Sequence, residues 1–167
     1  MNAGMSVTVA RRIMSKMPDV VFDMWLRPII GRIGWPFGSE LSSTFGTEWH
    51  RLFLQRVIQV IANLRWERRD LPFVRIPFAS VSQSTIDAML SHHVFGNRNL
   101  SLDAIPDSFD RFVGIQDFIR RHGKIPAPCV LMLDVGAYSI LDGHHRIGAL
   151  ASLPNAPLLS IDCWVGG

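Results

Sequence analysis

The chain has 167 residues, of which 48% are hydrophobic and 19% are charged, and its formal net charge is +3. Apolar content and length together suit one domain with a full core, with or without a helical appendage. The mild basic excess is compatible with nucleic-acid or nucleotide partners and identifies neither.

The pattern of apolar residues excludes a membrane-spanning helix, which needs roughly 20 uninterrupted apolar residues. The most apolar region, residues 20–35, is interrupted by charged residues and a proline, and no signal-peptide pattern opens the chain. Cys129 and Cys163 fall in predicted strands without Cys-x-x-Cys spacing, which favours two buried thiols over a disulfide or metal pair. We therefore expect a soluble, cytoplasmic protein.

The N-terminal part of the chain has helical patterns. Residues 7–17 and 19–26 predict two short helices, and Pro28 is expected to stop or kink the second. After a glycine- and proline-rich loop, the strongest helical periodicity covers residues 47–66, whose last turn is basic. We expect residues 1–70 to form a helical extension that caps the rest of the chain.

The second half alternates strands with helices. The order predicts an α+β fold over residues 71–167, with a small mixed sheet and helices around it. The predicted elements are a strand at 73–78, a helix at 85–92, a loop at 94–105 with or without one short turn, a helix from Asp107 or Ser108 to His122, strands at 129–133 and 138–141, a short helix, and a strand at 158–165.

A glycine turn joins the strand at 138–141 to the next helix. Its residues, Asp142-Gly143-His144-His145-Arg146, place four polar side chains in five positions. A helix N-terminus attracts phosphate through its unpaired N–H groups and its dipole, Gly143 allows close backbone approach, and Arg146 can donate two hydrogen bonds. The turn is a candidate phosphate site; the alternative is a helix start capped by Asp142, with exposed histidines.

This turn resembles the signature of the ParB/sulfiredoxin superfamily. Sulfiredoxins have Gly-Cys-His-Arg at this place, ParB-type proteins have Gly-x-Arg-Arg or Gly-x-His-Arg, and the free-serine kinases of the same fold have Asp-Gly-His-His-Arg, as here. The resemblance continues upstream through residues 112–128 and Val74-Arg75-Ile76-Pro77 to about Phe73, a little over half of the chain. It implies a nucleotide-binding domain of this type over residues 71–167.

The resemblance also implies roles for the turn. Gly143 and the N–H groups of residues 144–146 hold the phosphates of ATP or CTP, and Arg146 neutralises charge on the phosphoryl group. His144 or His145 is a phosphate ligand or a proton carrier, and Asp142 binds a divalent cation such as Mg²⁺ or orients the attacking group. Because His144 stands where sulfiredoxins have their nucleophilic Cys, we exclude sulfinic-acid reduction.

Other polar residues give weaker signals. His92 and His93 are typical of a helix C-terminus, with metal ligation as the alternative. No general base stands out, because the acidic candidates are more typical of caps or solvated charges; they are Glu48, Glu67, Asp87, Asp103, Asp107 and Asp110. Arg65, Arg68 and Arg69 begin a basic cluster that is either a solvated helix end or a DNA-backbone contact surface.

Three functions follow from these signals. The leading one is a nucleotide hydrolase, an ATPase or CTPase that binds or cuts DNA, similar in plan to the plasmid fertility-inhibition proteins of the superfamily, for which the resemblance implies ATPase and DNase activity. The absence of a helix-turn-helix pattern argues against centromere binding. The second is a kinase for a small hydroxyl compound, and the third is a protein-interaction module with a vestigial nucleotide site, which docks through its apolar N-terminal half.

Overall fold

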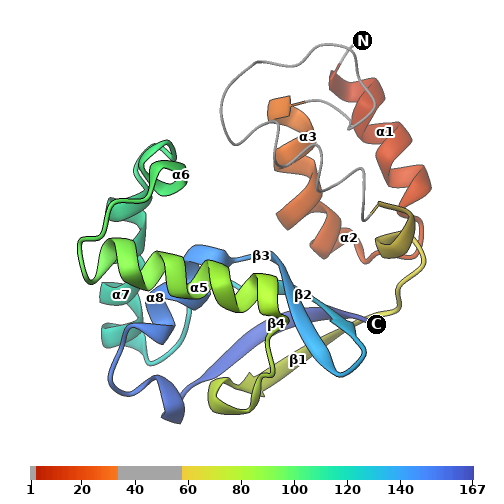
Figure 1. Cartoon of the computed structure of the whole chain (residues 1–167). Coiled ribbons are helices and arrows are strands. Elements are labelled where there is room, and N and C mark those ends of the chain that lie inside the picture. Colours follow the sequence, from red (N-terminus) through yellow and green to blue (C-terminus); the bar gives the residue numbers. More distant parts are fainter. Residues whose placement is uncertain (1–2, 34–57) are drawn as a thin grey trace. The chain divides into compact units, whose positions relative to one another are not determined.

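The computed structural model describes residues 3–33 and 58–167, and its contacts divide the chain into two compact units, Met1–Trp66 and Glu67–Gly167 (Figure 1). Most of the helix expected over residues 47–66, together with Glu48, lies outside the described residues. Residues 58–61 are helical, and the chain then leaves the helix before Trp66. No helix within the described ranges is long and apolar enough to cross a membrane.

The first unit contains α1 (Ala3–Ile13), α2 (Asp19–Val21), the π-helix η1 (Phe22–Leu26) and α3 (Arg27–Ile33). Of the two outcomes expected at Pro28, a stop or a kink, the stop is wrong, because the chain stays helical on both sides of Pro28. Proline lacks an N–H group and its ring collides with the carbonyl group four residues earlier. The wider π turn directly before α3 is a common way to absorb such a misfit.

A small apolar core holds the first unit together, with Phe22, Leu26 and Ile30 fully or almost fully buried. Trp25 packs against Trp66, their ring centroids 6.5 Å apart. Val9, Ile13 and Val20 remain exposed on the outer side of these helices. The expectation that this half docks a protein partner stays a prediction.

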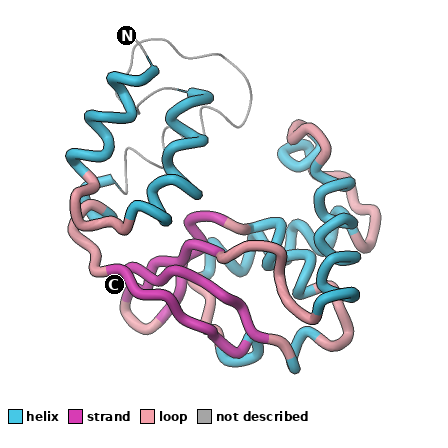
Figure 2. Tube along the Cα trace, turned by 180° about the vertical axis from the view of Figure 1, so that it is seen from behind, coloured by secondary structure: helices cyan, strands magenta, loops and turns pink. Residues whose placement is uncertain are grey.

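The second unit is built on an open, mixed sheet of four strands, which lie side by side in Figure 2. In the order β1-β4-β2-β3, β2 runs antiparallel to β3 and parallel to β4. This confirms the expected α+β class with a small mixed sheet. The strands are β1 (Trp66–Pro72), β2 (Cys129–Asp134), β3 (Ala137–Asp142) and β4 (Ser160–Gly166).

The expected strand at 73–78 is wrong: residues Phe73–Arg75 form a 3-10 turn (η2), and the strand is the charged segment before it. The segment has no apolar alternation that would predict a strand, but β1 is an edge strand, and an edge strand tolerates charged side chains on its open side. Of the predicted strand, Phe78 forms a β-bridge with Tyr138 of β3, and the Phe73 N–H donates to the Leu159 carbonyl at 2.9 Å. Arg68 and Arg69 therefore lie in β1, and the expectation that they end a helix is also wrong.

The helices of the second unit are α5 (Ser80–His93), α6 (Leu100–Asp103), α7 (Ser108–His122) and α8 (His144–Ala151), and a 3-10 turn (η3, Ala156–Leu158) precedes β4. α7 has the bounds expected from sequence, and Gly123 ends it in a left-handed conformation, with φ of 68°. α5 begins earlier than expected, and its buried Ser82 accepts a hydrogen bond from the Ile140 backbone N–H of β3 at 2.9 Å. This bond ties α5 to the sheet.

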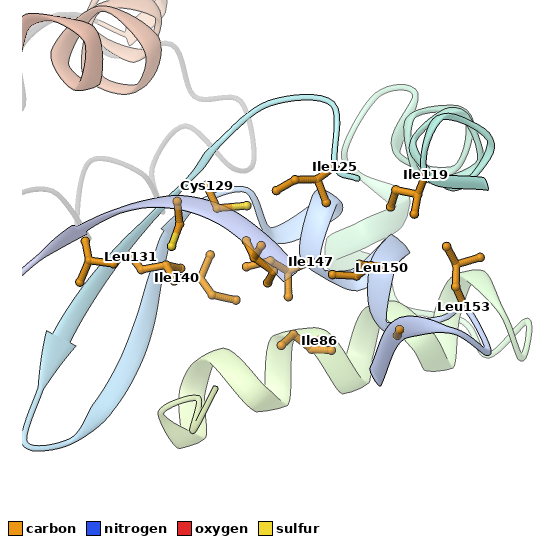
Figure 3. Packing of buried hydrophobic residues seen from close by; sticks show 13 residues of the cluster. Ile86, Ile119, Ile125, Cys129, Leu131, Ile140, Ile147, Leu150 and Leu153 are labelled. Atoms are coloured by element: carbon orange, nitrogen blue, oxygen red, sulfur yellow. The ribbon is translucent and has the colours of Figure 1, made fainter. Parts of the chain in front are cut away.

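α8 packs against both α5 and α7. Figure 3 shows its residues Ile147 and Leu150 between Ile86 of α5 and Ile119 of α7, and all four side chains are buried. Buried apolar contacts of this kind supply most of the stability of a short helix. The core therefore fixes the position at which α8 begins.

Candidate functional site

The predicted turn lies where β3 ends and α8 begins, and we call residues 142–146 the joint. Gly143 links the two elements with φ of 103°, a conformation that favours glycine. A Cβ added there would lie 2.6 Å from Cys129 Sγ and 3.1 Å from Arg146 Nε. Since Cys129 is fully buried in β2 and cannot move aside freely, both backbone and packing require glycine at the joint.

Asp142 does not cap the helix. Arg146 Nη2 donates a hydrogen bond to Asp142 Oδ2, so the two side chains form an ion pair across the joint. Gly143 occupies the N-cap position, and no side chain of the described residues accepts a hydrogen bond there. The alternative of a helix start capped by Asp142 is therefore wrong.

Arg146 keeps an unused donor. Its Nε is buried and has no hydrogen-bond partner among the residues that the structure describes. Only 17% of the side chain is exposed, against 37% for Asp142. Because a buried donor without a partner costs about 1–3 kcal/mol, the guanidinium would gain from an acceptor that reaches it. Turning away from Asp142 would present two adjacent donors to such an acceptor.

Cys129 lies beneath the joint and is not reactive. Burial raises the pKa of its thiol to about 12, although the nearby Arg146 acts in the opposite direction. A thiol with such a pKa stays protonated at neutral pH, and the protonated form is a poor nucleophile. Sulfur chemistry at the joint is therefore disfavoured by the structure as well as by the motif.

His145 belongs to a chain of hydrogen-bonded polar groups that are partly buried. Its Nε2 lies 2.9 Å from Ser108 Oγ at the start of α7, and the same oxygen lies 3.1 Å from His93 Nε2 at the end of α5. Burial is the main cause that lowers the pKa of both histidines, to about 4 for His145. Both rings are therefore neutral at pH 7, and the neighbouring His144 is half-buried.

Three of the other acidic candidates, Glu67, Asp87 and Asp103, are paired with neighbouring side chains. His92 bonds the Asn97 carbonyl through Nδ1 at 2.9 Å, and its Nε2 lies 3.4 Å from Asp103. Asp87 accepts a hydrogen bond from Gln83, and Glu67 pairs with Arg69. Within residues 3–33 and 58–167, no group of three His, Cys, Asp or Glu side chains is arranged to hold a metal. A metal would therefore need further ligands, such as phosphate oxygens.

The basic residues of β1 are already paired. Arg68 donates to both oxygens of Asp162, at 2.9 and 2.6 Å, which lowers the pKa of that carboxyl. Arg69 pairs with Glu67 and lies 3.5 Å from Tyr138 Oη. Lys124 is near enough to act on Asp162 as well. Of the predicted basic cluster, Arg68 and Arg69 thus lie in β1, and Arg65 precedes this strand in the chain. A DNA phosphate would have to compete with the carboxylates of Asp162 and Glu67 for these two arginines.

The sequence did not single out Ser108 as more than a helix cap, because its partners are 15 and 37 positions away in the chain.

The geometry of the joint offers a glycine turn, an uncapped helix start and a cation that can change partners. Comparison of the chain with protein-family models, with curated proteins and with solved structures finds no match. The joint itself is therefore the ground for a functional conclusion.

Proposed function

We propose that the second unit is a nucleotide-binding domain of ParB/sulfiredoxin type and that the protein hydrolyses ATP or CTP. The observation that carries the proposal is the start of α8: Gly143 has a left-handed conformation, no described side chain caps the helix, and Arg146 lies in the first turn. These features, together with the Asp-Gly-His-His-Arg motif, suit a phosphate better than a packed helix start.

In this mechanism the backbone of the joint receives the phosphates. Gly143 turns the backbone from β3 into the first turn of α8, and the positive end of the helix dipole favours the charge of the phosphates. Arg146 exchanges Asp142 for a phosphate oxygen and so neutralises charge that develops on the phosphoryl group. His144 then lies beside the phosphates as a hydrogen-bonding or proton-carrying group.

Asp142 is the residue that would hold a divalent cation. Once Arg146 turns to a phosphate, the carboxylate is free, and Mg²⁺ is usually held by one or two carboxylates together with substrate phosphates. A bound Mg²⁺ would supply further neutralisation of phosphate charge. The described residues fit this arrangement only with the nucleotide present, because they offer no complete metal site of their own.

DNA binding is a second candidate function, supported by one observation. Arg68 lies on the edge strand β1 and shares Asp162 with Lys124, whereas the side chain of Arg69, the next residue of the strand, points to the opposite face. Exposed ion pairs are weak, so a DNA phosphate can displace the carboxylates at little cost. Binding through such contacts should weaken steeply as salt increases.

The test is release of phosphate from ATP and from CTP, with and without Mg²⁺. Release without an added acceptor supports hydrolysis, whereas transfer that requires a hydroxyl compound such as serine favours the kinase alternative. Arg146→Ala should lose the activity, while Arg121→Ala, which removes an arginine bonded to the Asp117 carbonyl of α7, should keep it. If neither nucleotide binds to the intact protein, the proposal is wrong and an interaction module becomes the better account.

A further inference from the structure

The hydrogen-bonded chain His93–Ser108–His145, in which Ser108 is buried and the two rings are half-buried, joins three helices near the joint. Ser108 Oγ lies between the Nε2 atoms of the two rings, at 3.1 and 2.9 Å, and Ser108 is only 5% exposed. A serine hydroxyl has a single proton. Within the described residues the two rings are the recorded hydrogen-bond partners of Ser108 Oγ. Its proton therefore goes to one of the rings, which are neutral at pH 7, and the other ring donates an N–H group to its oxygen.

The surroundings of His93 decide which ring donates. Its Nδ1 is buried and has no hydrogen-bond partner among the described residues. A buried N–H group without an acceptor is rarer than a buried acceptor without a donor. The proton of His93 is therefore on Nε2, from which it is donated to Ser108. Ser108 in turn donates to His145 Nε2, which leaves the proton of His145 on Nδ1.

Packing and charge keep this arrangement neutral. His93 lies among aromatic rings, with centroids 4.8 Å from Phe112, 5.9 Å from Phe109 and 6.4 Å from His145. The groups that face His145 from the three helices are cationic or can become so: His93 of α5, Arg111 of α7, and His144 and Arg146 of α8. A further positive charge is unfavourable in such a place.

We propose that Ser108 and His93 are positioning residues that hold His145 in its Nδ1–H tautomer, so that the ring offers the joint an uncharged hydrogen-bond donor. The inference deepens the proposed function, since the acceptor would be a phosphate bound at the joint. It also excludes a simpler use of the same atoms, in which His145 activates Ser108 as a nucleophile. A base whose conjugate acid has a pKa of about 4 is too weak for that task at neutral pH, and Ser108 is buried.

The direct test is the ¹⁵N chemical shifts of the histidine ring nitrogens in the nucleotide-free protein at pH 7. His145→Gln and His93→Gln identify the two rings. We expect His145 to show a protonated Nδ1 and an unprotonated Nε2, and His93 to show the reverse. Finding His145 with its proton on Nε2, or doubly protonated, overturns the proposal whether or not any nucleotide binds.

Variants of Ser108 test the positioning role. Ser108→Ala removes the hydroxyl and should release His145 from the Nδ1–H tautomer, whereas Ser108→Thr should preserve it. Ser152→Ala is the matched control, because that hydroxyl bonds the Ala149 carbonyl at the far end of α8 and should leave the tautomer unchanged. An unchanged tautomer in folded Ser108→Ala contradicts the proposal.

A separate measurement links the tautomer to the nucleotide. Loss of one hydrogen bond to phosphate should raise the dissociation constant of ATP roughly fivefold in Ser108→Ala, and Ser108→Thr should restore it. If the unaltered protein binds no nucleotide, the proposed function fails, but the ring shifts still decide the tautomer. If ATP binds equally well to Ser108→Ala, the positioning role is refuted.

Discussion

Gly143→Ala tests whether the joint is as tightly constructed as the distances indicate. The alanine would have to adopt φ near 103°, which L-residues rarely take, and its Cβ would lie 2.6 Å from Cys129 Sγ. A left-handed conformation at a non-glycine residue costs about 1–3 kcal/mol, and overpacking a core costs about 1–3 kcal/mol. We therefore expect a loss of roughly 2–6 kcal/mol, against a total stability of about 5–15 kcal/mol for a domain.

Urea denaturation measures this loss, and a double-mutant cycle separates its two causes. Cys129→Ala removes the sulfur atom, so Gly143→Ala should cost less in that background by about 1–2 kcal/mol. The remaining cost reports the backbone conformation together with the Cys129 Cβ, which would still lie 3.1 Å away. Recovery by Cys129→Ala would show that the sulfur contact is real.

Gly114→Ala is the matched control. Gly114 lies within α7, and a Cβ there meets nothing within 4 Å. Replacing a helical glycine by alanine is expected to stabilise the protein by about 0.5–1 kcal/mol. If Gly143→Ala is as harmless as Gly114→Ala, the packing of Cys129 of β2 against the joint is wrong, and with it the argument that the joint requires glycine.

Three further predictions concern the charges of the second unit. Asp142→Asn should free Arg146, so that calorimetry without Mg²⁺ shows tighter ATP binding and a smaller effect of added Mg²⁺; unchanged affinity would contradict the exchange of partners. The pKa of His145 is lowered from 6.5 to about 4, so the unfolded chain binds its proton first. Stability should be complete above pH 6.5 and fall by up to about 3 kcal/mol as the pH decreases to 4, and His145→Gln should flatten the urea midpoint over this interval. Arg68→Ala should scarcely change stability, because its pair with Asp162 is exposed, but it should reduce the salt dependence of DNA binding in a fluorescence anisotropy titration.

Local patterns predicted the elements whose signals are contained within a few residues. The periodic face of α7 and the left-handed Gly123 gave its bounds, and the apolar runs of β2 and β3 gave theirs within a residue or two. β1 could not be found in this way, because its residues Glu67–Asp70 are charged and its partner β4 is far along the chain. The apolar residues just beyond Pro72 gave a stronger, but misleading, strand signal.

In the candidate site, too, the sequence predicted what lies within a few residues and missed the contacts between distant segments. The motif identified the joint and its residue types. Asp142 and Arg146 are four residues apart, a spacing that favours an ion pair, but the sequence analysis assigned both side chains to ligands instead. The bonds of Ser108 to His93 and His145 join separate helices, so no pattern in the sequence predicts them. The low pKa of His145 depends on that packing and was equally inaccessible.

Titration of the intact protein with ATP by isothermal calorimetry, beside the Arg146→Ala and Arg121→Ala variants, tests the central claim most directly. The account predicts saturable binding to the intact protein and to Arg121→Ala. It predicts at least a tenfold loss in Arg146→Ala, since charge-assisted hydrogen bonds contribute about 1.5–3 kcal/mol each. Equal affinity in Arg146→Ala, or no binding of ATP or CTP to the intact protein, would contradict it.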